Sequence, residues 1–168
     1  MGSGRGSSGQ GSCNIAFGKQ AMDALTTGCD NVAIGRDAMG ALTSGYQNVG
    51  VGCGALGTST TGCYNVAIGG NAGYHTTNSY NVNIGYQSGY YAYSDYMCVN
   101  IGYRAGRGDG NSSTTNYSVN IGRNAGRHQN TGEGCINIGN EAGYNNRTGA
   151  YNIMMGYHAG ACNYSGSN

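Results

Sequence analysis

Apolar and small residues alternate in a short block that recurs along the whole chain. The block reads Asn-Val-Ala-Ile-Gly at residues 31–35, and its final glycine recurs most often every 17 residues, with one step of 16 and one of 20. Alternation over a few residues predicts a β-strand with one buried face. A fixed short period predicts coils that stack on one another. We therefore expect an all-β fold, a β-solenoid of about nine 17-residue coils with parallel strand ladders. The nine glycines are Gly18, Gly35, Gly52, Gly69, Gly85, Gly102, Gly122, Gly139 and Gly156.

Each position of the repeat, numbered 1 to 17 from the asparagine, has its own character. Positions 2 and 4 are apolar almost throughout, as in Val32 and Ile34, so we expect them to form the inner face of the sheet. Position 8 is alanine in eight coils and Ser88 in the other, which predicts a small side chain inside the coil. Glycines at positions 5, 9 and 15 predict corners with positive φ or close backbone contact. A second short strand is expected near positions 10 to 13.

Composition and charge argue against several classes of function. The chain has 34 glycines, no proline, no tryptophan and a formal net charge of +1, which gives no field to attract nucleic acid or an anionic membrane. Near-neutrality favours self-association. The seven cysteines show no metal-ligand spacing, and the histidines and carboxylates are dispersed. We expect no membrane insertion, no metal or other cofactor and no catalytic site, so the protein is not expected to be an enzyme.

The repeat register also predicts the domain boundaries. Residues 1–13 form a Gly/Ser-rich N-terminal partial coil, and residues 14–168 form the nine-coil solenoid. The 20-residue step predicts a loop insertion near residues 107–117, which should project outward without shifting the register of the coils on either side. An integrin-type tripeptide, Arg107-Gly108-Asp109, and the opening spacing of a calcium loop occur there. Neither match is long enough to predict more than a solvated loop.

The repeat resembles two families of fibrous proteins. It is similar to the head repeat of trimeric autotransporter adhesins, whose S-V-A-I-G coils form a left-handed β-roll, and to the N-x-x-I-G-x-x-A-G repeats of phage tail fibres. The resemblance covers Asn14 to about Gly160, although the 17-residue period is longer than that of the adhesin head. It implies a fibrous role on the surface of cells or virions, and it brings no catalytic residue.

The leading functional expectation is a structural subunit of an extracellular or virion-associated fibre. Its partner would be a further copy of the chain, added end to end, because the first and last residues fall in repeat register and carry little charge. The residues expected at these contacts are Asn14, Ile15, Phe17, Ile153, Met155 and Asn168.

Two alternatives remain open from the sequence. One is a receptor- or glycan-binding segment of a phage tail fibre or surface adhesin, in which ladders of tyrosines and a local group of arginines contact the ligand or a neighbouring fibre. The other is an ice-binding solenoid with threonines at position 13, namely Thr26, Thr43, Thr60 and Thr77. The surface residues of the first alternative are Tyr74, Tyr86, Tyr90, Tyr103, Arg104, Arg107, Arg123 and Arg127.

Overall fold

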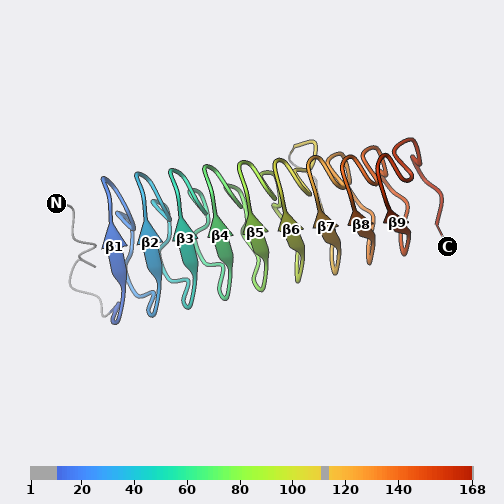
Figure 1. Ribbon diagram of the computed structural model, residues 1–168. Helices are drawn as coiled ribbons and strands as arrows, with labels where there is room; N and C mark the ends of the chain where they lie inside the picture. Colours follow the sequence, from blue (N-terminus) through green and yellow to red (C-terminus); the bar gives the residue numbers. More distant parts are fainter. Residues whose placement is uncertain (1–10, 111–113, 168) are drawn as a thin grey trace.

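The protein is a rod made of one parallel sheet and the turns that join its strands. The computed structural model describes residues 11–110 and 114–167 (Figure 1). Nine strands pair in chain order in a single sheet, which confirms the predicted all-β solenoid. Coil n is named here after the strand βn that it contains. The strands are β1 (Ile15–Phe17), β2 (Val32–Ile34), β3 (Val49–Val51), β4 (Val66–Ile68), β5 (Val82–Ile84), β6 (Val99–Ile101), β7 (Val119–Ile121), β8 (Ile136–Ile138) and β9 (Ile153–Met155).

Equivalent repeat positions lie directly beside one another in neighbouring coils. Val32 pairs with Val49, and the register holds across the 16-residue step, where Val66 pairs with Val82. It also holds across the 20-residue step, where Val99 pairs with Val119. The register of the strands on either side of coil 6 is therefore unchanged, as expected, while residues 111–113 of the predicted insertion lie outside the described residues.

The second strand expected at positions 10 to 13 is not formed. Within residues 11–110 and 114–167 each coil contains one three-residue strand, and positions 10 to 13 lie in turns. Single backbone bonds still join the coils there, such as the one from Thr26 N to Thr43 O, at 2.9 Å. The backbone is thus satisfied from coil to coil without an extended conformation.

The prediction that positions 2 and 4 form the inner face is wrong. The residue between them points inward: Ala33 and Ala67 are fully buried, whereas Ile34 and Ile68 are 39% and 41% exposed. Val32 and Val66 are half-buried. The reason is the size of the coil, because so narrow a ring has room for one inward side chain from each strand but not for two branched ones. Position 8 does lie inside, and Ala38 and Ala55 are fully buried.

The interior is filled in two different ways along the rod. Coils 1 to 3 place a long apolar side chain at position 9 and a small residue at position 3, as with Met39 and Ala33 in coil 2. Coils 5 to 8 reverse the sizes, as with Gly89 and Asn83 in coil 5, where a Cβ on the glycine would lie 2.0 Å from Asn83 Oδ1. The two positions therefore share one volume, as close packing requires. The pairs in coils 5 to 8 are Asn83/Gly89, Asn100/Gly106, Asn120/Gly126 and Asn137/Gly143.

Buried asparagines form hydrogen-bonded ladders along the rod. Asn31 Oδ1 accepts from both the backbone N–H and the side-chain amide of Asn48, at 3.0 Å each, and Asn48 Nδ2 donates to Gly62 O at 2.7 Å. Position 1 of coils 6 and 8 is a cysteine instead. Cys98 Sγ donates to Thr115 O, and burial raises the pKa of Cys98 to about 12. The two buried cysteines, Cys98 and Cys135, are thus members of the ladder, and all seven cysteines of the chain are free thiols.

The rule that sheet position, not hydrophobicity, determines burial can be tested on adjacent residues of β4. We expect Ile68→Asn to lower the free energy of unfolding of the monomer by about 1 kcal/mol or less, because this side chain is 41% exposed. Ala67→Leu should cost about 2 to 3 kcal/mol, because it forces three further carbon atoms into a fully buried position. Urea unfolding followed by circular dichroism measures both, and the reverse order of effects would contradict the inward orientation of Ala67.

Candidate assembly surface

The outward side of the sheet is apolar from one end of the described rod to the other. Each strand places two side chains on it, at positions 2 and 4, and we call this set of residues the Val/Ile face. The strands succeed one another in a single row along the rod (Figure 1). Because equivalent positions pair in register, as Val32 with Val49 and Ile34 with Val51, these residues form two continuous columns. The face consists of Ile15, Phe17, Val32, Ile34, Val49, Val51, Val66, Ile68, Val82, Ile84, Val99, Ile101, Val119, Ile121, Ile136, Ile138, Ile153 and Met155.

The charged residues on the two sides of the Val/Ile face have opposite signs. Position 6, directly after the strand and its glycine, carries only cations among its charged residues: Lys19, Arg36 and Arg123. Positions 16 and 17, directly before the next strand, carry only the acids Asp30 and Glu133. The cations and these acids therefore lie on opposite sides of the face, near β1 and β2 and again near β7 and β8, and within the rod Arg36 pairs with Asp37 and Arg123 with Glu141.

The predicted end-contact residues lie on the first and last strands. Among the described residues β1 and β9 each have one neighbouring strand. Their side chains are the most exposed apolar groups of the sheet, with Phe17 at 75% and Ile153 at 66%. Ile15 and Met155 are also exposed, whereas Asn14 is half-buried and bonded to Asn31. Asn168 lies outside the described residues.

The predicted tyrosine pairs stack along the rod. The rings of Tyr74 and Tyr90 are 5.3 Å apart between centroids and nearly parallel, at 7°, and those of Tyr86 and Tyr103 are 5.8 Å apart at 17°. His75 lies against Tyr90, and partial burial lowers its pKa. Within each pair the rings turn a face toward each other, which stabilises adjacent coils but leaves mainly ring edges and hydroxyl groups toward solvent.

The four predicted arginines do not form one cationic site. Arg104 lies over the Tyr103 ring and donates to Gln87, and Arg107 lies over the Tyr91 ring, so both reach back toward coil 5. Arg123 and Arg127 reach the other way, toward Glu141 and Tyr144 of coil 8. Arg107 and Arg127, which occupy the same repeat position in adjacent coils, thus point away from each other, as the repulsion between like charges favours.

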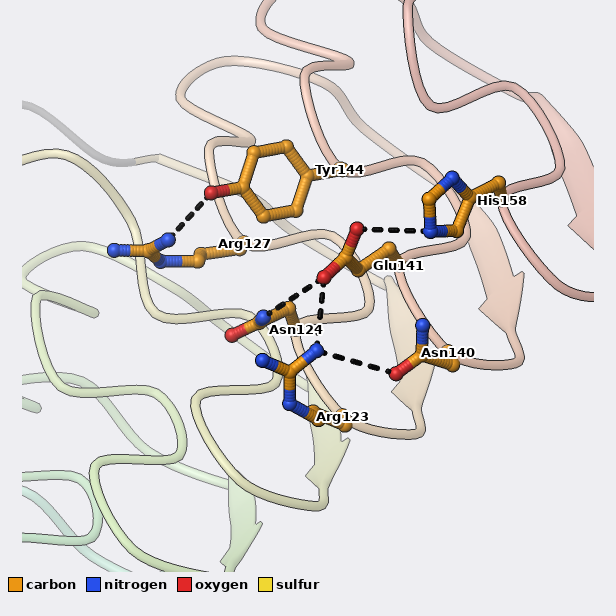
Figure 2. Close-up of polar contacts among 7 residues, drawn as sticks. All are labelled: Arg123, Asn124, Arg127, Asn140, Glu141, Tyr144 and His158. Carbon is orange, nitrogen blue, oxygen red and sulfur yellow. Dashed lines mark hydrogen bonds and ion pairs between the residues drawn. The ribbon is translucent and has the colours of Figure 1, made fainter.

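The last three coils hold a compact polar network around Glu141 (Figure 2). One carboxylate oxygen of Glu141 accepts from Arg123 at 2.9 Å, and the other pairs with His158 Nε2 at 3.0 Å. Asn124 donates to the first oxygen at 3.4 Å. Arg123 and Asn124 belong to coil 7, Glu141 to coil 8 and His158 to coil 9, so the network ties these three coils together. Among the described residues no group of three or more His, Cys, Asp or Glu side chains could hold a metal ion.

A second line of tyrosines was missed by the sequence analysis. Five of them, each the last or the last but one residue of coils 2 to 6, form an unbroken series of ring contacts beside the Val/Ile face, and we call it the tyrosine ladder. A hydrogen bond with the Tyr64 hydroxyl raises the pKa of the first member, Tyr46, to about 12. The signal was present, since a tyrosine is the last residue of coils 3, 4, 6 and 8, but Tyr46 and Tyr96 stand one residue earlier in their coils and break the column. The ladder consists of Tyr46, Tyr64, Tyr80, Tyr96 and Tyr117.

The remaining sequence features are integrated into the rod surface. Asp109, of the integrin-type tripeptide, pairs with His128 and Arg147, and Arg107 is held against tyrosine rings. Two residues of the suggested calcium loop, at positions 111 and 113, lie outside the described residues. The position-13 hydroxyls of Thr26 and Thr43 donate to backbone carbonyls of the next coil, at 2.9 and 3.0 Å. Those donors therefore serve coil stacking.

The fold and this surface define the class of protein: a single-sheet parallel β-solenoid with an exposed apolar face. Comparison of the chain with family models, curated proteins and solved structures gave no match. No helix in residues 11–110 and 114–167 is long and apolar enough to cross a membrane.

Proposed function

We propose that the chain is a structural subunit of an extracellular or virion-associated fibre, and that its rods associate side by side through the Val/Ile face. The observation that carries the proposal is the continuous column of outward valines and isoleucines. Contiguous exposed apolar patches on soluble proteins usually mark interaction sites. Burial of such a face contributes about 25 cal/mol per Å² of apolar surface removed from water. The partner that fits best is a second copy of this chain, because its flat strand row repeats with the same spacing.

The charges beside the face favour a parallel arrangement of the copies. When two rods point the same way, the basic edge of one face lies opposite the acidic edge of the other at the same height. Lys19 then approaches Asp30, and Arg36 and Arg123 approach Asp30 and Glu133 in addition to their pairs with Asp37 and Glu141 within the rod. In an antiparallel pair, edges of like sign would meet. Complementary charges at the rim of an interface fix orientation and suppress the wrong register.

End-to-end stacking remains the second contact of the proposed fibre. The exposed strands β1 and β9 have apolar side chains at positions 2 and 4, as the strands inside the sheet do. A strand with an unpaired edge is a template for another strand. Addition of a further coil there would continue the parallel pairing that joins every coil of the rod.

The experiment that tests side-by-side association replaces four position-2 valines by threonine, at Val49, Val66, Val82 and Val99. Threonine keeps the branched shape and the strand preference but puts a hydroxyl group on the face. We expect sedimentation equilibrium to show an oligomer for the wild type and at least a tenfold weaker association for the variant. Circular dichroism should show an unchanged sheet.

A matched variant controls for the number of substitutions. It changes four exposed position-14 residues to alanine, at Ser44, Thr61, Ser94 and Thr131, and it should associate like the wild type. A wild type that stays monomeric at all concentrations, or a threonine variant that associates equally well, would refute the proposal. Oxidative disulfide mapping gives the orientation: parallel copies should link Cys53 of position 6 to Cys29 or Cys63 of position 16, whereas antiparallel copies should link like edges.

The two alternatives, glycan or receptor binding and ice binding, remain predictions. The stacked tyrosines offer a glycan mainly ring edges and hydroxyl groups, and the arginines that would accompany them reach in opposite directions. For ice binding, the hydroxyls of Thr26 and Thr43 already donate within the rod. The geometry therefore supports the fibre role better than either.

A further inference from the structure

The tyrosine ladder contains one pair of rings that differs from the others. Between centroids, consecutive rings lie 5.2, 4.8, 5.7 and 6.1 Å apart along Tyr46, Tyr64, Tyr80, Tyr96 and Tyr117. Three contacts are edge-on, at 79°, 82° and 90°, but Tyr64 and Tyr80 are parallel within 9° and closest together. The 16-residue step of the repeat separates these two residues, and both stand directly before a strand.

The backbone holds the Tyr64–Tyr80 pair in place. Tyr64 N donates to Tyr46 O and Tyr80 N donates to Cys63 O, at 3.1 Å each, so each residue is fixed to the coil before it. The side chains are 40% and 45% exposed, which leaves their ring edges open to small oxidants in solution. Two oxidisable rings are therefore preorganised in contact at an accessible surface.

We propose that Tyr64 and Tyr80 are a site of oxidative modification at which a one-electron oxidant of the peroxidase and hydrogen peroxide class joins coils 3 and 4 through a dityrosine bond. Each phenol loses one electron and its phenolic proton, giving two tyrosyl radicals. A carbon–carbon bond then forms between ring carbons ortho to the oxygens. The hydrogen on each coupled carbon moves to its phenolic oxygen, which restores both aromatic rings. Two electrons and two protons in total reduce one H₂O₂ to two H₂O.

Ring geometry and exposure make this pair the favoured product, since the stacked pair Tyr74–Tyr90 is wider, at 5.3 Å, and less exposed. In this stacked pair the rings are parallel within 9° and 4.8 Å apart between centroids, so coupling requires the rings to approach but not to reorient. An edge-on pair must first reorient one ring by about a right angle, as the measured 79° to 90° angles show. The chain has no tryptophan that could compete as the site of oxidation. The proposal concerns a bond within one chain and does not depend on side-by-side association.

The test treats the folded protein with a peroxidase and stepwise additions of hydrogen peroxide. Dityrosine fluorescence reports the reaction, and peptide mapping locates the product. Trypsin leaves residues 37–104 as one peptide, because no Lys or Arg lies between Arg36 and Arg104. We expect this peptide to become lighter by two hydrogen atoms, with fragmentation placing the new bond between Tyr64 and Tyr80.

Matched variants separate this pair from the other tyrosines. Tyr80→Phe keeps the ring in the stack but cannot form a tyrosyl radical, so the early yield of the linked peptide should fall at least tenfold. Tyr103→Phe makes the same change in the stacked but wider pair with Tyr86 and should leave the yield unchanged. Oxidation of the urea-unfolded chain should abolish the preference for one pair.

Three results would overturn the proposal. The first is a first-formed bond at another tyrosine pair, the second is an undiminished yield in Tyr80→Phe, and the third is a product that joins Cys63 to a ring in place of the two tyrosines. A Cys63→Ser variant guards against thiol capture of the radical, and in it the Tyr64–Tyr80 bond should again be the first product.

Discussion

Gly89→Ala should lower the free energy of unfolding by about 3 kcal/mol or more, although it adds one methyl group. The new Cβ would lie 2.0 Å from Oδ1 and 2.7 Å from Cγ of Asn83. Asn83 is fully buried and its Oδ1 accepts from Asn100 Nδ2 at 2.9 Å, so it cannot swing aside without losing that bond. The φ of +56° at this position adds about 1 kcal/mol for a residue with a side chain. Thermal and urea unfolding measure the loss.

A second substitution should reverse part of this loss. In Asn83→Ala/Gly89→Ala the clashing amide is gone, so we expect the double variant to be more stable than Gly89→Ala alone, with an interaction free energy of about 1 kcal/mol or more. Gly40→Ala is the control, because its nearest neighbour would be 3.4 Å away and its φ is not positive. It should change stability by about 0.5 kcal/mol or less. Strict additivity of the two single changes would show that positions 3 and 9 do not share one volume.

The same pairing of positions explains what the chain pattern could and could not predict about the interior. Periodicity alone predicted the parallel register, the inward alanines of position 8 and the close approach at position 15, where a Cβ on Gly45 would lie 2.3 Å from Gly62 O. The orientation of the strand was predicted wrongly because alternation separates two faces without saying which one is covered. The exchange of Met39 with Ala33 for Gly89 with Asn83 between coils was the signal that position 3 points inward, since only residues that share a space need to compensate in size.

The surface was predictable where residues repeat at one position and not elsewhere. Tyr86 and Tyr103 both occupy position 6, so their contact followed from the period. Where Arg107 and Arg127 point does not follow from it, because two cations at position 10 can turn toward each other's coil or away. The Val/Ile face was visible in the sequence as a column of apolar residues, but was assigned to the core. Because this face is exposed, we expect contacts between copies along the side of the rod in addition to those at its ends.

The close approach of successive coils at position 5 is the most demanding feature of the fold, and it predicts the largest single effect. At Gly102 a Cβ would lie 2.5 Å from the carbonyl oxygen and 2.7 Å from the carbonyl carbon of Gly122, and φ is +132°. Both neighbours are backbone atoms of the next coil, held by the pairing of β6 with β7. They can move only if the coils separate.

We therefore expect Gly102→Ala to cost more than about 4 kcal/mol and to disrupt the rod around coils 6 and 7, because the clash breaks the strand pairing itself. Gly156→Ala is the matched control: it has the same repeat position and a similar φ of +123°, but no described atom beyond its chain neighbours lies within 4 Å of the added Cβ. It should lose only the cost of the backbone conformation, about 1 to 2 kcal/mol. Hydrogen exchange should then show fast amides on both sides of residue 102 in the first variant and wild-type protection there in the second. Equal losses in the two variants would mean that φ alone selects glycine at position 5, and that contact between coils has no part in it.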